Sequence, residues 1–183
     1  MAWSFANLFR PSSLEANAYR LYQETVTQAR KPVFYESWGV PDTPLGRFDA
    51  IVLHCFLVLN RLKDDAGTDR FAEKFSEAIF TDMDRSLREM GVGDLSVGKK
   101  VRKLAEGFYG RSAAYAQALE TGDAALAKTL GRNLYGEAEH PDSAVLDTVA
   151  RYVRASEAIL ASQRTDDLMD GKIRFARLSG EAE

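Results

Sequence analysis

Residues 79–111 read IFTDMDRSLREMGVGDLSVGKKVRKLAEGFYGR, and this stretch decides the fold. Its first part completes a series of apolar residues, three or four apart, that begins at Phe71 and marks one face of an α-helix. Gly91 is placed to end this helix, because glycine favours the backbone conformation of a helix C-cap. Asp94 or Ser96 can then cap a second helix, which continues to Gly122. The stretch predicts two helices joined by a glycine-rich corner, and nothing in it resembles a reaction centre.

Helical spacing also dominates the rest of the chain, and strand-like alternation is absent. Beyond the pair at the corner we expect helices over about 13–30, 46–63, 123–135 and 143–163, which makes about six in all. Proline and glycine predict a loop without regular helix at 32–46, and its large apolar residues predict that it packs on the core. After Thr165 the pattern is weak, with Ile173 and Phe175 able to dock. The sequence predicts an all-α protein, a single-domain bundle over residues 1–183 with its core at about 12–163.

The composition of the 183 residues, 45% hydrophobic and 28% charged, is ordinary for a soluble globular domain. A net charge of -3 argues against a general nucleic-acid binder. The single cysteine, Cys55, excludes an internal disulfide and fits a reducing compartment. The N-terminus has the character of neither a secretory signal nor an import sequence, and the longest apolar run, 50–59, is shorter than the roughly 20 residues of a membrane span. We therefore expect a soluble cytoplasmic protein.

One candidate site is a metal centre of a hydrolase-like enzyme, built from His54 with Asp49, Asp82 and Asp84. Residues two apart on a helix point in different directions, so Asp82 and Asp84 do not converge without help. The alternative interpretation is that each of these side chains has a structural partner within the protein. Asp82 then accepts hydrogen bonds from a tyrosine or an arginine, Asp84 pairs with Arg88, and His54 is a core imidazole with a polar partner. No cofactor is predicted.

A second candidate is the cationic group that opens the helix after the corner. It consists of Lys99, Lys100, Arg102 and Lys103. The helix macrodipole disfavours cations near a helix N-terminus, and such local conflicts tend to mark functional sites. The group can bind a phosphate, an anionic lipid surface or ribosomal RNA. The alternative is a solvated face whose charge is balanced by nearby acids.

Several longer strings resemble the ubiquinol–cytochrome c chaperone family. Its first half is matched by ARKPVFY (29–35), GVPDT (39–43), GRFD (46–49) and LHCFLVLNRL (53–62). Its second half is matched by FTDMDRSLREMGVGD (80–94), VGKKV (97–101), FYGR (108–111), and by RN and YG at 132–133 and 135–136. The resemblance covers about residues 19–160, in order and with matching spacing, which is more specific than any single short motif.

The resemblance implies an all-helical assembly factor of the cytochrome bc1 complex that is not an enzyme. Mitochondrial members hold newly made cytochrome b and act near the ribosomal tunnel exit with a small partner protein. Lacking an import sequence and a membrane extension, this chain resembles a bacterial version in the cytoplasm, peripheral to the inner membrane face. The implied partners are cytochrome b, an anionic membrane surface or the ribosome; whether a small partner protein is engaged stays open.

A client of this kind exposes apolar helices beside cationic loops, so we expect a binding surface with apolar, acidic and basic groups. The acidic residues expected to meet client cations are Asp42, Asp49, Asp82 and Asp84. The basic residues expected to meet lipid phosphates or RNA are Arg47, Arg88, Lys99, Lys100, Arg102, Lys103 and Arg111. Val92 in the corner and Tyr109 are expected to supply apolar contact.

Overall fold

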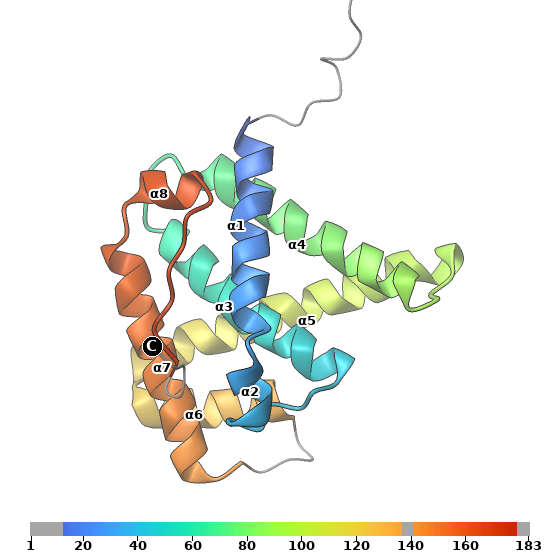
Figure 1. Ribbon diagram of the computed structural model, residues 1–183. Helices are drawn as coiled ribbons and strands as arrows, with labels where there is room; N and C mark the ends of the chain where they lie inside the picture. The colour runs from blue at the N-terminus through green and yellow to red at the C-terminus, as the bar shows by residue number, and fades with distance from the viewer. Residues whose placement is uncertain (1–12, 137–140, 179–183) are drawn as a thin grey trace, which may run out of the picture.

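The computed structural model describes residues 13–136 and 141–178, and within these ranges it is all-helical (Figure 1). The elements are α1 (Ser13–Ala29), α2 (Pro32–Glu36), α3 (Pro44–Leu62), α4 (Asp69–Glu89), α5 (Asp94–Thr121), α6 (Asp123–Leu130), the π-helical turn η2 (Gly131–Tyr135), α7 (Ser143–Ser162) and α8 (Thr165–Met169). The predicted all-α class is confirmed, and the six expected helices correspond to α1, α3, α4, α5, α6 and α7. The fifth changes to a π-helical turn where we expected one continuous helix.

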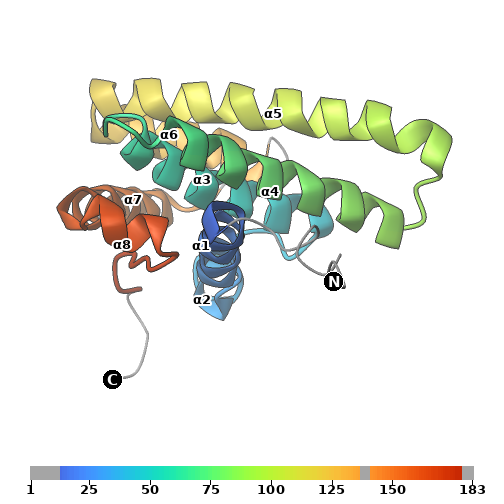
Figure 2. The ribbon, with the colours of Figure 1, turned by 90° about the horizontal axis from the view of Figure 1, so that it is seen from above.

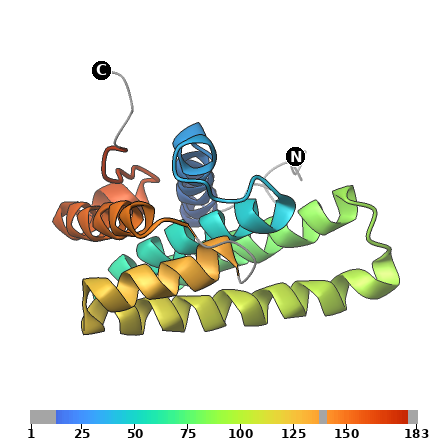
Figure 3. The ribbon, with the colours of Figure 1, turned by 90° about the horizontal axis from the view of Figure 1, so that it is seen from below.

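Helix α3 is the central element, as its apolar composition predicts. Thr43 caps its start by accepting a hydrogen bond from the Gly46 N–H (3.1 Å), and Pro44 follows in the first turn, where proline is tolerated. It contacts α1, α5, α7 and η2. Seen from above and from below, α5 lies along one side, α3 and α4 lie next to it, and α1 crosses them on the other side (Figures 2 and 3).

Helices α4 and α5 form a long hairpin whose corner lies at the end of the molecule away from α7 and α8 (Figure 2). The C-terminus of α4 closes as predicted, with Gly91 at φ +82°. The N–H of Gly91 donates to Arg88 O (2.9 Å) and the N–H of Val92 donates to Leu87 O (3.0 Å), which together form a Schellman motif. The predicted cap of α5 is wrong: Gly93 holds the N-cap position, and Asp94 is the first helical residue. The Asp94 carboxylate instead pairs with Arg88.

The expectation of irregular backbone throughout 32–46 is also wrong at both ends of that segment. Pro32 begins the short helix α2, because its missing N–H is no loss in a first helical turn. Helix α3 likewise starts earlier than expected, at Pro44. Between them Trp38 is buried, and its carbonyl accepts a hydrogen bond from the Tyr135 hydroxyl (2.7 Å). The core also continues past residue 163, since Leu168, Ala176 and Leu178 belong to it.

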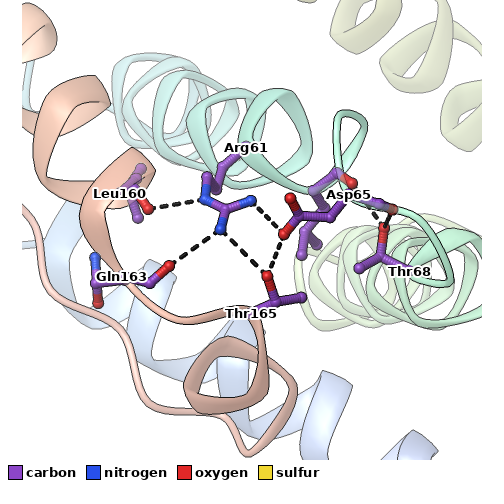
Figure 4. A network of polar contacts seen from close by, with 7 residues as sticks. Arg61, Asp65, Thr68, Leu160, Gln163 and Thr165 are labelled. Atoms are coloured by element: carbon purple, nitrogen blue, oxygen red, sulfur yellow. Dashed lines mark hydrogen bonds and ion pairs between the residues drawn. The ribbon is translucent and has the colours of Figure 1, made fainter.

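Arg61 joins the end of α3 to the junction between α7 and α8 (Figure 4). Its Nε–H donates to Leu160 O (2.9 Å), one Nη donates to Gln163 O (3.0 Å), and the other pairs with the Asp65 carboxylate (2.5 Å). The Thr165 hydroxyl donates to the same carboxylate. Because the guanidinium is planar and offers five N–H donors, a single side chain satisfies carbonyls that a helix end leaves without intrahelical partners. Among the described residues, no helix combines the length and the apolar composition needed to cross a bilayer.

Candidate functional site

An open groove of about 560 Å³ lies between the C-terminal half of α1, the start of α3, the C-terminal half of α4 and the middle of α5. Its walls are mainly apolar. The apolar side chains are Pro44, Leu45, Phe48, Ile51, Met83, Leu87, Met90 and Leu104. The polar residues are Tyr22, Arg30, Asp42, Thr43, Arg47, Asp82, Ser86 and Glu89. The groove is large enough for side chains of another polypeptide or for a small apolar ligand.

Two apolar side chains of the groove are left open to solvent. Leu45, in the first turn of α3, is 60% exposed, and Met90, the C-cap residue of α4, is 59% exposed. Met90 belongs by its spacing to the apolar series that also contains Met83 and Leu87, which predicts that all three share one helix face. This is wrong because α4 ends at Glu89, so Met90 lies beyond the last helical turn. A groove with exposed apolar side chains beside it and charged groups around it is typical of a site for a polypeptide partner.

Asp42 and Arg47 are brought together beside the groove. The Arg47 Nε–H donates to the Asp42 carboxylate at 2.5 Å, and a second N–H donates at 3.2 Å. This hydrogen bond lowers the pKa of Asp42, and the same guanidinium lies 5.6 Å from the centre of the Tyr35 ring. Both charged groups are exposed, so the pair is available to a partner and adds little to stability.

Asp82 also lines the groove, but its carboxylate is already held from two sides. It accepts a hydrogen bond from the Tyr22 hydroxyl (2.8 Å) and pairs with Arg85, which confirms the structural alternative for this residue. Burial, Cys55 and the bond to Asp82 all raise the pKa of Tyr22. The Tyr22 hydroxyl therefore remains a proton donor at neutral pH and fixes Asp82 against α1.

Asp84 and Arg88 are joined as predicted, at 2.5 Å. Arg88 pairs in addition with Asp94, so one guanidinium links the end of α4 to the start of α5. Neither Asp84 nor Arg88 lines the groove. Their positions indicate that they stabilise the corner, and the sequence pattern had suggested a partner-binding role for both.

Asp49 and Arg111 form an ion pair that joins α3 to α5, at 3.0 Å. Asp49 is only 5% exposed, and its burial raises the pKa of the carboxyl to about 6 although Arg111 acts in the opposite direction. The Arg111 guanidinium also lies 6.0 Å from the centre of the Phe48 ring, which lines the groove. The pair therefore supports one wall of the groove from behind, and Asp49 itself is shielded from solvent.

The remaining candidates lie on α5 and the corner, outside the groove lining. All four cations of the predicted group, Lys99, Lys100, Arg102 and Lys103, are exposed. Tyr109 is 58% exposed, with its ring 5.9 Å from that of Phe80 and 5.6 Å from that of Phe108. Val92 is half-buried in the corner. The structure thus divides the predicted residues: Asp42, Arg47 and Asp82 belong to the groove, whereas the cations of α5 form a separate surface.

His54 lies in the centre of the core and is 0% exposed. Its Nδ1 lies 2.8 Å from Ala50 O, and because a carbonyl only accepts, this nitrogen carries the proton. Its Nε2 accepts from the Tyr152 hydroxyl (2.8 Å), which in turn accepts from the Gln28 amide (3.0 Å). Burial lowers the pKa of His54 to about 4. The core-imidazole alternative is confirmed, and both ring nitrogens are engaged.

The aspartates of the proposed metal centre are likewise engaged elsewhere, each with its own arginine. Across 13–136 and 141–178, no three side chains of histidine, cysteine, aspartate or glutamate gather into a group that could hold a metal ion. Sequence reasoning missed Arg30, Leu45 and Glu89 as groove residues. One feature of the sequence could have indicated the groove. Leu45 is an apolar residue between Pro44 and Gly46, at the start of a helix, where the helical pattern does not require a buried side chain.

Comparisons with known proteins agree with this fold. A ubiquinol-cytochrome-c reductase complex assembly factor 1 from Xenopus laevis is 25% identical over 153 residues, covering 83% of this chain and 76% of that protein. The mitochondrial protein CBP3 of Saccharomyces cerevisiae is 25% identical over 159 residues, covering 84% of this chain and 47% of that protein. The chain thus spans about three quarters of the frog relative and about half of the yeast one.

A crystal structure of the Cbp3 homolog from Brucella abortus matches with a TM-score of 0.81 and 35% sequence identity, over 92% of this chain and 93% of that one. The sequence model of the family described as ubiquinol-cytochrome C chaperone matches residues 36–175. That range contains α3 to α8 and most of the groove. The chain therefore belongs to the ubiquinol-cytochrome C chaperone family, which is a family of assembly factors and not of enzymes.

Proposed function

We propose that this protein is a chaperone for assembly of the cytochrome bc1 complex, and that it binds newly made cytochrome b at the cytoplasmic face of a bacterial membrane. The family supports the first part of the proposal. The observation that carries the second is the open apolar groove with Leu45 and Met90 exposed beside it. Such a groove suits a client that has apolar helices and has not yet met its permanent partners.

The charges around the groove fit a client with ends of both signs. Asp42 and Glu89 supply exposed carboxylates, and Arg30 and Arg47 supply exposed guanidinium groups, whereas Asp82 is held by Tyr22 and Arg85. An apolar helix that ends in cationic residues can lay its apolar face against Phe48, Ile51 and Leu104 and its charged end near the carboxylates. Pairs that are already formed, such as Asp42 with Arg47, can exchange partners at little cost because both groups are exposed.

A deletion strain tests the assembly role. We expect loss of the assembled bc1 complex with other respiratory complexes retained, and normal bc1 levels would refute the assignment. Returning the gene with Leu45→Ser and Met90→Ser is expected not to restore the complex, although the protein folds, because both side chains are more than half exposed. Rescue by this double variant would remove the groove from the proposal.

Photo-crosslinking in cells tests the identity of the client. A crosslinking amino acid at position 45 or 90 is expected to capture cytochrome b, whereas one at the exposed Arg151 on α7 is not. Equal capture at the control position would indicate contact without a defined site. The same samples show whether ribosomal proteins or a small partner protein are engaged.

A further inference from the structure

We propose that the corner between α4 and α5 docks on an anionic lipid bilayer, with Val92 and Leu95 as its apolar contacts and the cations of α5 as its phosphate contacts. Residues 92–103 are called the corner surface below. The inference goes beyond the client groove and does not depend on it.

Leu95 is the first observation. It is 105% exposed, the highest value among the large apolar side chains of the described residues. It lies in the first turn of α5, directly after the corner, where the hairpin reaches the end of the molecule (Figure 2). No neighbouring helix covers it, and the Schellman motif and the pairing of Arg88 with Asp94 hold its backbone in place. A fixed, fully exposed leucine at a protruding end suits partial insertion into a lipid surface.

The orientation of α5 supplies the second observation. Val97 and Phe108 are buried against the body of the molecule and define its inner face. At 100° per residue, Leu95, Lys99 and Arg102 lie together on the opposite side, and Lys103 adjoins them. The apolar side chain and three of the four cations therefore share one outward face. Lys100 points about 100° away from Lys99, and Glu106, one turn after Arg102, continues the outward face beyond the cations.

Charge supplies the third observation. None of Lys99, Lys100, Arg102 and Lys103 makes an ion pair with a described residue, although the chain as a whole is acidic. By contrast, the acids of the corner have partners: Asp94 pairs with Arg88, and Glu89 lies 3.9 Å from Arg85. All four side chains are therefore available to an external anion. Lipid phosphates beside an apolar layer match both parts of the surface, whereas RNA phosphates leave Leu95 without a contact.

The consequence for the groove is geometric. Glu89 and Met90 line the groove and are the residues that lead into the corner. Docking through the corner surface would bring that end of the groove to the bilayer, which is where a membrane-protein client emerges.

The test is co-sedimentation of the full chain with vesicles of phosphatidylcholine, with and without three tenths phosphatidylglycerol. We expect binding to the anionic vesicles that weakens as salt is raised. Changing Lys99, Lys100, Arg102 and Lys103 to glutamine is expected to weaken it by at least about a hundred-fold, since each cation contributes roughly five-fold. Leu95→Ser is expected to weaken it by about ten-fold.

The matched control changes four exposed cations on other elements to glutamine: Lys63, Arg70, Lys128 and Arg177. It alters the net charge equally and is expected to bind almost as well as the wild type. Equal loss in both quadruple variants, or equal binding to neutral vesicles, would overturn the proposal. So would preferential binding to RNA through the same four residues, which would make the corner surface a nucleic-acid site.

Insertion can be read directly from a dye at Leu95→Cys. The native Cys55 is 0% exposed, so the new thiol is the one that reacts. A blue shift of the dye on anionic vesicles supports insertion, and no shift contradicts it. These assays contain no cytochrome b. Their failure leaves the client groove standing, and failure of the groove variants leaves the corner surface standing.

Discussion

Replacing Asp49 with asparagine is expected to change how stability depends on pH between about 4 and 6.5. Asp49 and His54 lie on the same helix, and both are buried. Burial favours the neutral form of each, so the pKa of Asp49 rises from 3.8 to about 6 and that of His54 falls from 6.5 to about 4. The two groups therefore titrate over the same range with opposite effects on stability.

The signs and sizes follow from the linkage between proton binding and folding. The raised pKa of Asp49 contributes stability that is present below pH 3.8 and is lost as the pH rises through about 6. The lowered pKa of His54 contributes stability that is present above pH 6.5 and is lost as the pH falls through about 4. At about 1.4 kcal/mol per pKa unit, each contribution is roughly 3 kcal/mol, so they nearly cancel in the wild type.

Urea unfolding followed by circular dichroism at several pH values measures the effect. In Asp49→Asn the opposing contribution of Asp49 is gone, and the free energy of unfolding is expected to rise by roughly 3 kcal/mol from pH 4 to 6.5. Asp147→Asn, at an exposed carboxylate, controls for the loss of one negative charge. If the curves of Asp49→Asn and wild type run parallel across this range, the carboxyl is not held in a desolvated site and the reasoning fails.

Four further variants test the contacts that hold the fold, each by urea unfolding. Arg61→Lys keeps the charge but loses the planar set of donors, and a loss of about 2 kcal/mol is expected; an unchanged midpoint would show that one ammonium replaces the whole network. Gly46→Ala would place a methyl 2.0 Å from Pro41 O, so a loss of about 2 kcal/mol is expected, whereas Gly98→Ala meets open space in a helix and is expected to stabilise by up to about 1 kcal/mol. The reverse order of these two glycine variants would contradict the close approach. Tyr152→Phe removes the hydroxyl shared by the imidazole and amide of the core, with an expected cost of about 1–3 kcal/mol; a neutral effect would mean that those groups find other partners.

The bounds of the long helices could be predicted from the sequence to within a few residues. Each of these helices has apolar residues at helical spacing and a residue at its end that favours termination. Gly91 and Gly122 end α4 and α5 with positive φ, as their positions indicated. The helix boundaries were predicted wrongly at residues whose type is compatible with two different structural roles. Pro32 was interpreted as a helix breaker but begins α2, and Asp94 was interpreted as a cap but serves as an ion-pair partner.

The site was less predictable from the sequence. The shape of a groove depends on where neighbouring helices end and how far apart they lie, and the pattern of residues within each helix does not fix either. The sequence indicated Asp42, Arg47 and Asp82 as binding residues, and all three line the groove. It gave no sign that Met90 would lie past the end of α4 and open to solvent. It also could not separate cations that pair with acids of this chain, such as Arg88 and Arg111, from cations without such a partner.

The segment that follows α8 affects when one side of the core can close during synthesis of the chain. The Gln163 side chain bonds to both the N–H and the carbonyl of Arg174 (2.8 Å each), and the Ala176 N–H donates to the Ser156 hydroxyl (3.2 Å). The Phe175 ring closes over His54 at 5.2 Å. Synthesis runs from the N-terminus, so a nascent chain paused before these residues leave the ribosome lacks the Phe175 ring over its central imidazole. Residues 174–176 must therefore leave the ribosome before this side of the core can close.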